Sequence, residues 1–468
     1  MSETELGRQI SRVIKRGFFP TSPAATLREA IFSEILAGVL GASPTTTELD
    51  ELKAYFDSHN AIDDDELSDQ VWEVFEKTYT TTGARGARGK KAKRYIVPFH
   101  PEIAKRIRPH ETRNWGEWYR MLMTRGDPPE FNSKLHGQFV NRLETLEPSN
   151  LFEQLIIDIA SQLEYDDVET AMEPLPPYID DNARVFQSDL RRWLDDKYDS
   201  PSNWLQSARD LFCFHFMIYY VQLAINLEME FSRAADDRIE SFEPEIRPVY
   251  FGMWDETASN DRQFSREWRE RDERGIEGHV YDSWGRLAVL NEIVTVLNAD
   301  ENNKSGIATL SDALELPEEV QQEFVHQLKS ELPEEGLTRS TDLSTVANIF
   351  AREVRRYYES RTRANQTPIT MGINVVRQLG DGGERMYLRT QRKVGPTFRL
   401  NRGALRLFAR LFAMNADDTH YDEFVKYLQR RGVFLDSQSE TSALEELDEM
   451  GMIDRQSDSG GAVYVRSL

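Results

Sequence analysis

Apolar residues recur every three or four positions over most of this 468-residue chain. This spacing places them on one side of an α-helix and predicts amphipathic helices packed around a shared core. Alternation of apolar and polar residues, which is typical of strands, is confined to short pieces. The pattern predicts a mainly α protein with several helical blocks and a small β element. Helices are expected at residues 27–40, 47–59, 67–79, 150–163, 182–197, 284–297, 318–332 and 341–361.

The longest apolar stretch spans residues 211–231. A helix needs about 20 apolar residues to cross a bilayer, whereas His215, Gln222 and Asn226 interrupt this stretch and Glu228 lies near its end. We expect a helix buried in the protein core, with His215 hydrogen-bonded there rather than bound to a metal. Residues 1–9 are polar and show no signal-peptide pattern, so we expect a cytoplasmic protein without a membrane partner.

Residues 403–468 have the most specific pattern. Helical spacing at 403–414, 421–432 and 439–451 is followed by two strand-like pieces around a turn. This order of elements is that of a winged helix, whose third helix commonly enters the major groove of DNA. Here the third helix is acidic and has no Lys or Arg, so phosphates would repel it. We expect it to dock a protein partner, unless the first helix and the hairpin bind nucleic acid. Its candidate partner contacts are Glu445, Glu446 and Glu449.

Breaks in composition divide the chain into blocks without an internal repeat. The predicted organisation is an N-terminal helical block at 1–82, a basic loop segment at 83–110, a central helical core at 111–300 that includes the buried helix 211–231, a helical block at 301–376, a basic β-hairpin at 377–402 and a winged-helix module at 403–468.

The chain has 57 Lys and Arg residues against 80 Asp and Glu, which gives a formal net charge of −23. Only 13 of the basic residues are Lys and 44 are Arg. Such a composition is typical of halophilic, haloarchaeal-type proteins, because salt screens the repulsion between surface carboxylates. The alternative is an acidic protein that binds a partner. The net charge therefore gives little guidance about the ligand.

Two segments are strongly basic against this background. Residues 84–108 carry nine Lys and Arg with one acid, and residues 377–410 carry nine with two acids. Concentrated basic segments are typical of polyanion-binding surfaces. The alternative is that they neutralise acidic surfaces of the same protein or of a partner. The predicted DNA-binding residues are Arg85, Arg88, Lys90, Lys91, Lys93, Arg94, Lys105, Arg106, Arg385, Arg389, Arg392, Lys393, Arg399, Arg402 and Arg406.

No catalytic motif is evident. Cys213 is the only cysteine, which excludes an intramolecular disulfide and a zinc site built from thiolates. The run at 83–91 (GARGARGKK) resembles a phosphate-binding loop, but Ala84 stands at its first glycine position and Lys91 at its Ser or Thr position. We interpret this run as a flexible basic segment. The scattered histidines do not have the spacing of a metal pair.

Asp180 together with residues 195–197 (Asp-Asp-Lys) loosely resembles a two-metal nuclease, in which carboxylates hold Mg²⁺ and a lysine orients water. Such groups normally lie on paired strands, whereas residues 195–197 end a predicted helix. We therefore expect a protein that is not an enzyme, with no catalytic residues, no metal, no cofactor and no small-molecule substrate. A metal-dependent nuclease is kept as an alternative.

Residues 250–254 are mostly aromatic and are followed by a polar segment at 255–262. Aromatic surface beside polar groups could stack a base or anchor a protein partner. The alternative, which we favour, is that these aromatic side chains pack against the helix at 211–231. Trp254 is the candidate partner contact in this segment.

Three segments together resemble a known family. They are FCFHFMIYYVQLAINL at 212–227, PVYFGMWDETASNDRQFSREW at 248–268 and the ending from Gly432 onwards. In order and character they are similar to DptG, a component of phosphorothioation-dependent restriction systems. The resemblance covers roughly the last half of the chain and includes no catalytic motif. It implies an assembly with ATP-using, helicase-like DptF and DptH partners that attacks DNA lacking sulfur in its backbone.

The resemblance and the basic segments lead to one expected function. The chain is expected to be a non-catalytic, DNA-engaging or scaffolding subunit of an antiviral restriction complex. Its expected partners are double-stranded DNA and DptF-like and DptH-like ATPase or helicase subunits. The alternative from another class is a stand-alone winged-helix transcriptional regulator, which would bind an operator by itself.

Overall fold

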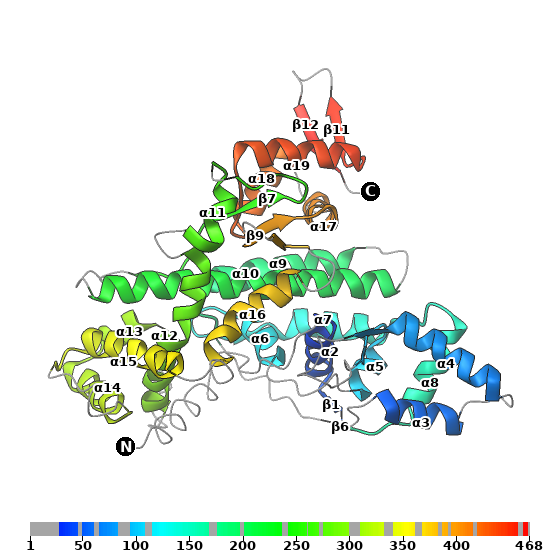
Figure 1. Ribbon diagram of the computed structural model, residues 1–468, viewed down its shortest axis with the longest axis horizontal. Coiled ribbons are helices and arrows are strands. Elements are labelled where there is room, and N and C mark those ends of the chain that lie inside the picture. Colours follow the sequence, from blue (N-terminus) through cyan, green and yellow to red (C-terminus); the bar gives the residue numbers. More distant parts are fainter. Residues whose placement is uncertain are drawn as a thin grey trace.

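The structure is a computed structural model. It is mainly helical with small sheets (Figure 1). Two helical lobes lie at the bottom of Figure 1, two long helices cross above them, and the C-terminal elements lie at the top. The described residues are 28–44, 49–59, 65–82, 94–107, 115–167, 176–196, 201–235, 242–259, 261–270, 275–298, 309–331, 340–360, 367–381, 386–391, 395–414, 419–456 and 462–466.

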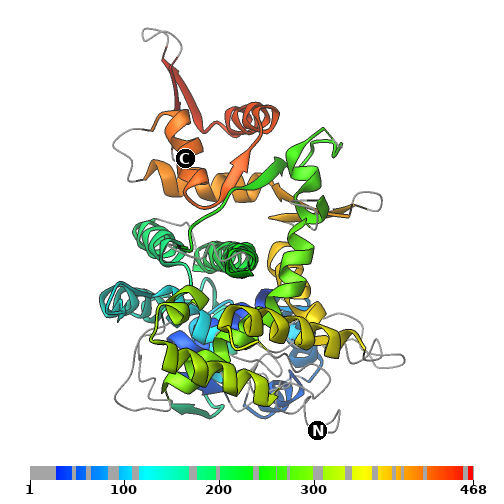
Figure 2. The same cartoon turned by 90° about the vertical axis from the view of Figure 1, so that its left-hand side faces the viewer.

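Helix α10 (Pro201–Ala235) runs through the middle of the fold and is about 52 Å long. It lies beside α9 (Asp180–Asp195), and both helices are seen nearly end-on in Figure 2. Residues 203–235 are long enough to span a membrane and include an 18-residue window of mean hydropathy 1.3, but that window is entirely buried in the protein. The predicted core helix at 211–231 is therefore confirmed, and it is longer than predicted.

The polar side chains of α10 find partners inside the protein. The Gln222 amide exchanges two hydrogen bonds of 2.7 Å with the backbone of Arg247, and Asn226 pairs with the backbone of Glu245 in the same way. His215 Nε2 lies 3.1 Å from a carboxylate oxygen of Asp189. Because these polar side chains are hydrogen-bonded, the helix can be buried without leaving their polar atoms unpaired. His215 is thus a hydrogen-bonded core residue, as predicted.

One lobe packs beneath the C-terminal half of α10. Its helices are α12 (Gly275–Asn298), α13 (Leu310–Leu314), α14 (Glu318–Glu331), α15 (Leu343–Glu359) and α16 (Thr367–Asp381). Helices α12 and α15 cross so closely at Gly285 that a Cβ atom there would lie 2.2 Å from the carbonyl oxygen of Ala351. A glycine is therefore required at this crossing.

The other lobe contains α2 (Arg28–Val39), α3 (Leu49–His59), α4 (Asp65–Tyr79), α5 (Pro101–Arg106), α6 (Trp115–Leu122), α7 (Ser133–Glu144) and α8 (Leu151–Ala160). Three antiparallel strand pairs connect them: β1 (Ala42–Pro44) with β6 (Tyr165–Asp167), β2 (Thr80–Thr82) with β3 (Arg94–Ile96), and β4 (Thr124–Arg125) with β5 (Glu130–Phe131).

This lobe corrects one predicted boundary. Residues 94–107 are predicted to be part of a basic loop segment, yet they contain β3 and α5, and Ile96 and Ile103 are buried in a second hydrophobic cluster with Phe56 and Phe75. The prediction was wrong over these residues because both elements are too short to show a clear period. The remainder of that segment, 83–93 and 108–110, lies outside the described residues.

A four-stranded sheet joins distant parts of the chain in the order β10-β7-β9-β8. Strands β7 (Val249–Met253), β9 (Gly395–Leu400) and β10 (Val433–Leu435) run parallel, and β8 (Leu388–Gln391) is antiparallel to β9. Helix α11 (Gln263–Glu270) packs on β7 and β9. The predicted hairpin at 377–402 is present as β8 and β9, although α16 continues to Asp381 before it.

The C-terminal elements follow the predicted order. They are α17 (Arg402–Ala413), α18 (Tyr421–Gln429), α19 (Ser437–Glu449) and the antiparallel hairpin of β11 (Ile453–Gln456) and β12 (Ala462–Val465). The third helix begins earlier than predicted because Asp436 caps it: the Asp436 side chain accepts a hydrogen bond from the Ser439 amide. Strand β10 precedes α19 and pairs with β7, so the sheet attaches α19 to the body of the protein.

Candidate nucleic-acid interface and docking pocket

The first basic segment contributes little free charge where the structure describes it. Arg94 pairs with Glu76 at 2.6 Å, and Lys105 and Arg106 pair with Glu102 at 2.9 and 3.2 Å. These three residues therefore neutralise acids of the same protein, which was the alternative interpretation. Arg85, Arg88, Lys90, Lys91 and Lys93 lie outside the described residues.

In the second basic segment, the prediction that Arg399 binds DNA is wrong. Its side chain is fully buried, and its Nη1 donates hydrogen bonds of 2.6 Å to the Met253 carbonyl and 3.0 Å to the Glu256 carbonyl. Burial lowers its pKa to about 10. Strand β9 is buried along its whole length, so a basic residue on it points into the protein.

Arg389 is also engaged within the protein. Its Nη1 donates to the Trp254 carbonyl, and its guanidinium lies 5.1 Å from the centre of the Trp254 ring. It therefore holds the Trp254 loop in place rather than reaching outward. Arg385, Arg392 and Lys393 lie outside the described residues.

Arg402, Arg406 and Arg410 form a stripe along α17, because residues four apart lie on the same side of a helix. Arg402 pairs with Glu446 and Glu449 on α19, and Arg410 pairs with Asp196 at 2.8 Å. Arg406 is exposed between them. Arg406 and Arg410 line a cavity of about 340 Å³ whose opposite wall includes polar residues of the first two turns of α10.

All four predicted partner contacts meet in one pocket. Trp254, from the loop after β7, and Glu445, Glu446 and Glu449, from α19, line a cavity of about 840 Å³ together with Arg402. We call it the acidic pocket. Asp255 and Glu256 add two more carboxylates to its wall. The sequence predicted these contacts separately, and the structure brings them together.

A buried arginine fixes the geometry of the acidic pocket. Arg262 donates hydrogen bonds of 2.9 and 2.8 Å to the two carboxylate oxygens of Asp436 and one of 3.0 Å to Glu256. Glu256 in turn accepts hydrogen bonds from the hydroxyls of Ser439 and Ser442. These contacts join the loop after β7 to the first turns of α19, so the two walls of the pocket keep their spacing.

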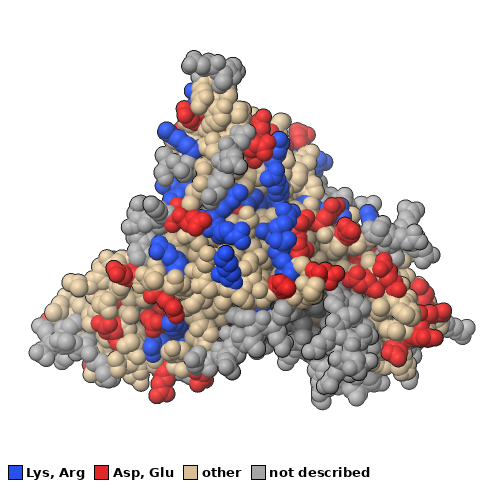
Figure 3. Space-filling view, turned by 180° about the vertical axis from the view of Figure 1, so that it is seen from behind, with Lys and Arg blue, Asp and Glu red and all other residues tan. Residues whose placement is uncertain are grey.

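Basic side chains gather where α9, α17 and α18 pack together, on the side of the molecule seen in Figure 3. We call this surface the basic face. Arg192 links the three helices, because it donates to the Leu411 carbonyl on α17 and lies 5.3 Å from the Tyr427 ring on α18. We define the basic face as the basic residues of these helices and of the C-cap of α18, without Arg402: Arg184, Arg191, Arg192, Arg406, Arg410, Lys426 and Arg430.

Some members of the basic face are neutralised by neighbours and others are not. Arg184 pairs with Asp181, and Lys426 pairs with Glu423. Arg191, Arg406 and Arg430 are exposed and form no ion pair within the part of the chain that the structure describes. On a protein with a net charge of −23, these three arginines are available to an anionic ligand.

A buried charge cluster holds α9, α10 and α18 together beneath the basic face. The Asp189 carboxylate on α9 accepts hydrogen bonds from Arg431 and from the Tyr427 hydroxyl, and it contacts His215 on α10. Burial alone would raise the pKa of Asp189, but Arg431 and His215 outweigh it and hold that pKa well below its ordinary value. Burial lowers the pKa of His215. Asp189 and Arg431 thus form a charged pair inside the core.

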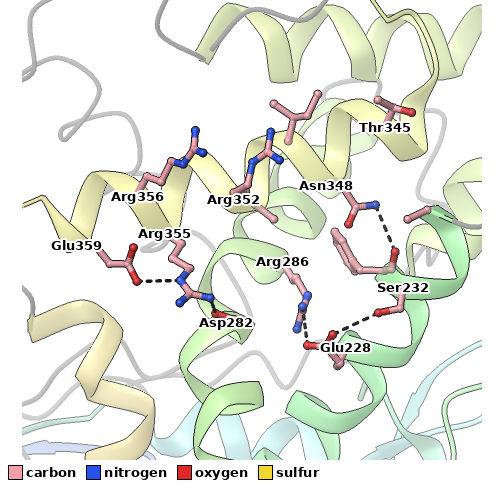
Figure 4. Close-up of a pocket in the computed structure, with 14 residues that line it drawn as sticks. Glu228, Ser232, Asp282, Arg286, Thr345, Asn348, Arg352, Arg355, Arg356 and Glu359 are labelled. Carbon is pink, nitrogen blue, oxygen red and sulfur yellow. Dashed lines mark hydrogen bonds and ion pairs between the residues drawn. The ribbon is translucent and has the colours of Figure 1, made fainter. Parts of the chain in front are cut away.

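A second arginine-rich pocket lies between α10, α12 and α15 and has a volume of about 650 Å³ (Figure 4). Its acids are already paired: Arg286 contacts Glu228 at 2.7 Å, and Arg355 contacts Asp282 and Glu359 at 2.5 and 2.9 Å. The pairs tie α12 to α10 and α15 to α12. This pocket therefore serves as an ion-pair network between helices, and its exposed arginines provide controls for the basic face.

The geometry separates the carboxylates of the two-metal nuclease alternative, and its lysine, Lys197, lies outside the described residues. Asp180 lies at the first residue of α9 and Asp195 at the last, about 22 Å apart along the helix. Asp180 accepts hydrogen bonds from Arg125 and from the Gly126 amide, and Asp196 pairs with Arg410. No group of three or more potential metal ligands gathers among the described residues.

The basic face was missed by sequence reasoning, apart from Arg406. Arg191 and Arg192 stand near Asp189, Asp195 and Asp196, so the local charge of that segment is close to zero. The sequence feature that could have indicated the basic face is a pair of adjacent arginines, at 191–192 and again at 430–431. No protein-family model matches the chain, and no curated protein matches it.

Proposed function

We propose that this protein is a non-catalytic, DNA-engaging and scaffolding subunit of a phosphorothioation-dependent restriction complex that works with ATPase or helicase-like partners. The observation that carries the proposal is the basic face. Three exposed arginines without described ion-pair partners, Arg191, Arg406 and Arg430, lie on three helices that pack together on an acidic protein. Arginines of this kind suit phosphate oxygens, which they bind independently of base sequence.

Under the same proposal, residues 402–465 form a winged helix that binds a protein partner through its third helix instead of DNA. Its third helix, α19, exposes Glu445, Asp448 and Glu449 and so repels phosphates. The strand before that helix pairs with β7, which directs α19 toward the acidic pocket. A stand-alone regulator would have to contact DNA bases with α19, and the negative charge of this helix argues against that.

The acidic pocket is the proposed docking site for an ATPase partner. It combines an aromatic ring, Trp254, with five carboxylates and one arginine, Arg402. Tryptophans in pockets are frequent binding hot spots, and a carboxylate-lined wall suits a partner segment rich in Lys or Arg. Docking would leave the basic face uncovered, so DNA and partner would be held by different surfaces of one subunit.

Site-directed cleavage of bound DNA tests the proposed interface. Cys213 is the only cysteine and is buried, so a thiol introduced at the surface can be labelled selectively with an iron–EDTA reagent. Ser188 lies on α9 between Arg184 and Arg191, and Ser330 is exposed on α14. We expect Ser188→Cys to cleave bound duplex DNA and Ser330→Cys to leave it intact. Cleavage from position 330 alone would reject the interface.

Partner docking is tested with purified subunits. Trp254→Ala should weaken binding of the ATPase subunit about 10- to 30-fold, which is the usual effect of truncating an interface tryptophan. Leu151→Ala is the control, because Leu151 is 90% exposed and lies on α8, away from the acidic pocket. Titration calorimetry measures both affinities. Equal affinities of the Trp254→Ala variant and the natural protein would exclude the pocket as the docking site.

A further inference from the structure

Helix α17 begins between two cavities of opposite charge. Its capping residue, Asn401, lines both the acidic pocket and the cavity that contains Arg406 and Arg410. Arg402 follows directly and continues the arginine stripe of α17 into the acidic pocket. The stripe and the pocket therefore share one residue.

The contacts of Arg402 are easily exchanged. Its Nε donates to Glu446, and its Nη2 lies 2.7 Å from a carboxylate oxygen of Glu449. The side chain of Arg402 is 58% exposed, that of Glu449 68% and that of Glu446 24%. Because the guanidinium is largely in solvent, water and salt screen its ion pairs, and these contacts hold it only weakly.

We infer that Arg402 is a phosphate-binding residue that α19 sequesters in the free protein. The inference rests on the proposed function, because it places DNA along α17. Glu446 and Glu449 present carboxylate oxygens to the same guanidinium donors that would bind a phosphate. The two carboxylates therefore compete with DNA for Arg402, and DNA binding includes the transfer of this side chain from α19 to the duplex.

Sequestration of Arg402 couples the two surfaces of the protein. A cationic partner segment that docks on Glu446 and Glu449 releases Arg402 and so strengthens DNA binding. DNA that captures Arg402 leaves the two carboxylates open to the partner. The two effects are equal in free energy because coupling between binding sites is reciprocal.

A double-mutant cycle, measured as affinity for duplex DNA, distinguishes sequestration of Arg402 from a general effect of removing negative charge. Glu446→Gln with Glu449→Gln should raise the affinity for duplex DNA about fivefold, at the lower end of typical coupling. In the Arg402→Gln background the same pair of changes should raise it less than about twofold. Glu445→Gln removes a charge from the same helix without touching the two carboxylates that hold Arg402, and it measures the long-range effect alone.

The salt dependence of binding gives an independent readout. Arg402→Gln should lower the slope of log affinity against log salt by about 0.9, which corresponds to one lost phosphate contact. An unchanged slope, or equal gains in both backgrounds, overturns the inference while leaving the basic face as a DNA site. Absence of salt-dependent DNA binding by the natural protein would instead reject the proposed function itself, and the inference with it.

Discussion

Replacing Arg431 by Met is expected to lower the free energy of unfolding by about 3–5 kcal/mol near neutral pH. The change leaves the carboxylate of Asp189 buried without its main counter-charge, since Asp189 is fully buried and Arg431 is its bidentate partner. Tyr427 and His215 can supply hydrogen bonds but no permanent positive charge. Urea unfolding of both proteins measures the difference.

The loss of stability caused by Arg431→Met should become smaller as the pH falls. In the natural protein the lowered pKa of Asp189 gives stability that is present above the ordinary pKa of an Asp side chain and is lost as the pH falls below it. Without Arg431, burial dominates and raises that pKa. Protonation then relieves the buried charge, so the deficit of the Arg431→Met variant should shrink as the pH falls.

An exposed pair provides the matched control. Arg356 contacts Glu353 at 2.7 Å, and its side chain is 63% exposed. Arg356→Met should therefore change stability by only about 0–1 kcal/mol. Equal losses from Arg431→Met and Arg356→Met would show that the Asp189 cluster does not hold α9 and α18 together beneath the basic face.

Local periodicity was sufficient to predict the long elements. The apolar spacing predicts α9, α10, α14 and α15, and the order of the C-terminal elements was also predicted. Short elements such as α5, with six residues, contain too few turns to show a period. Arg399 was misplaced because a strand buried on both faces looks, by composition, like part of an exposed basic segment.

The two proposed surfaces depend on contacts between residues far apart in sequence. The acidic pocket requires the parallel pairing of Phe251 with Leu435, which no local pattern reveals. The basic face requires Asp189 to meet Arg431 across 242 residues. Along the sequence Arg191 is surrounded by acids, and only the packing of α9 against α17 brings its helix beside the helix of Arg406.

The central claim is that the basic face binds DNA through phosphate contacts. Changing Arg191, Arg406 and Arg430 together to Ala should weaken duplex binding about 10- to 100-fold at about 0.2 M salt, since each lost contact removes about 0.9 from the salt slope. The matched control changes Arg266, Arg352 and Arg356 to Ala. These residues carry the same charge and are exposed on α11 and α15.

The decisive measurement is the slope of log affinity against log salt for the natural protein and these two triple variants. We predict a slope that is smaller by about 2.7 for the basic-face variant and almost unchanged for the control. Equal slopes for the two triple variants would contradict the claim, because DNA would then respond to total charge and not to the surface formed by α9, α17 and α18.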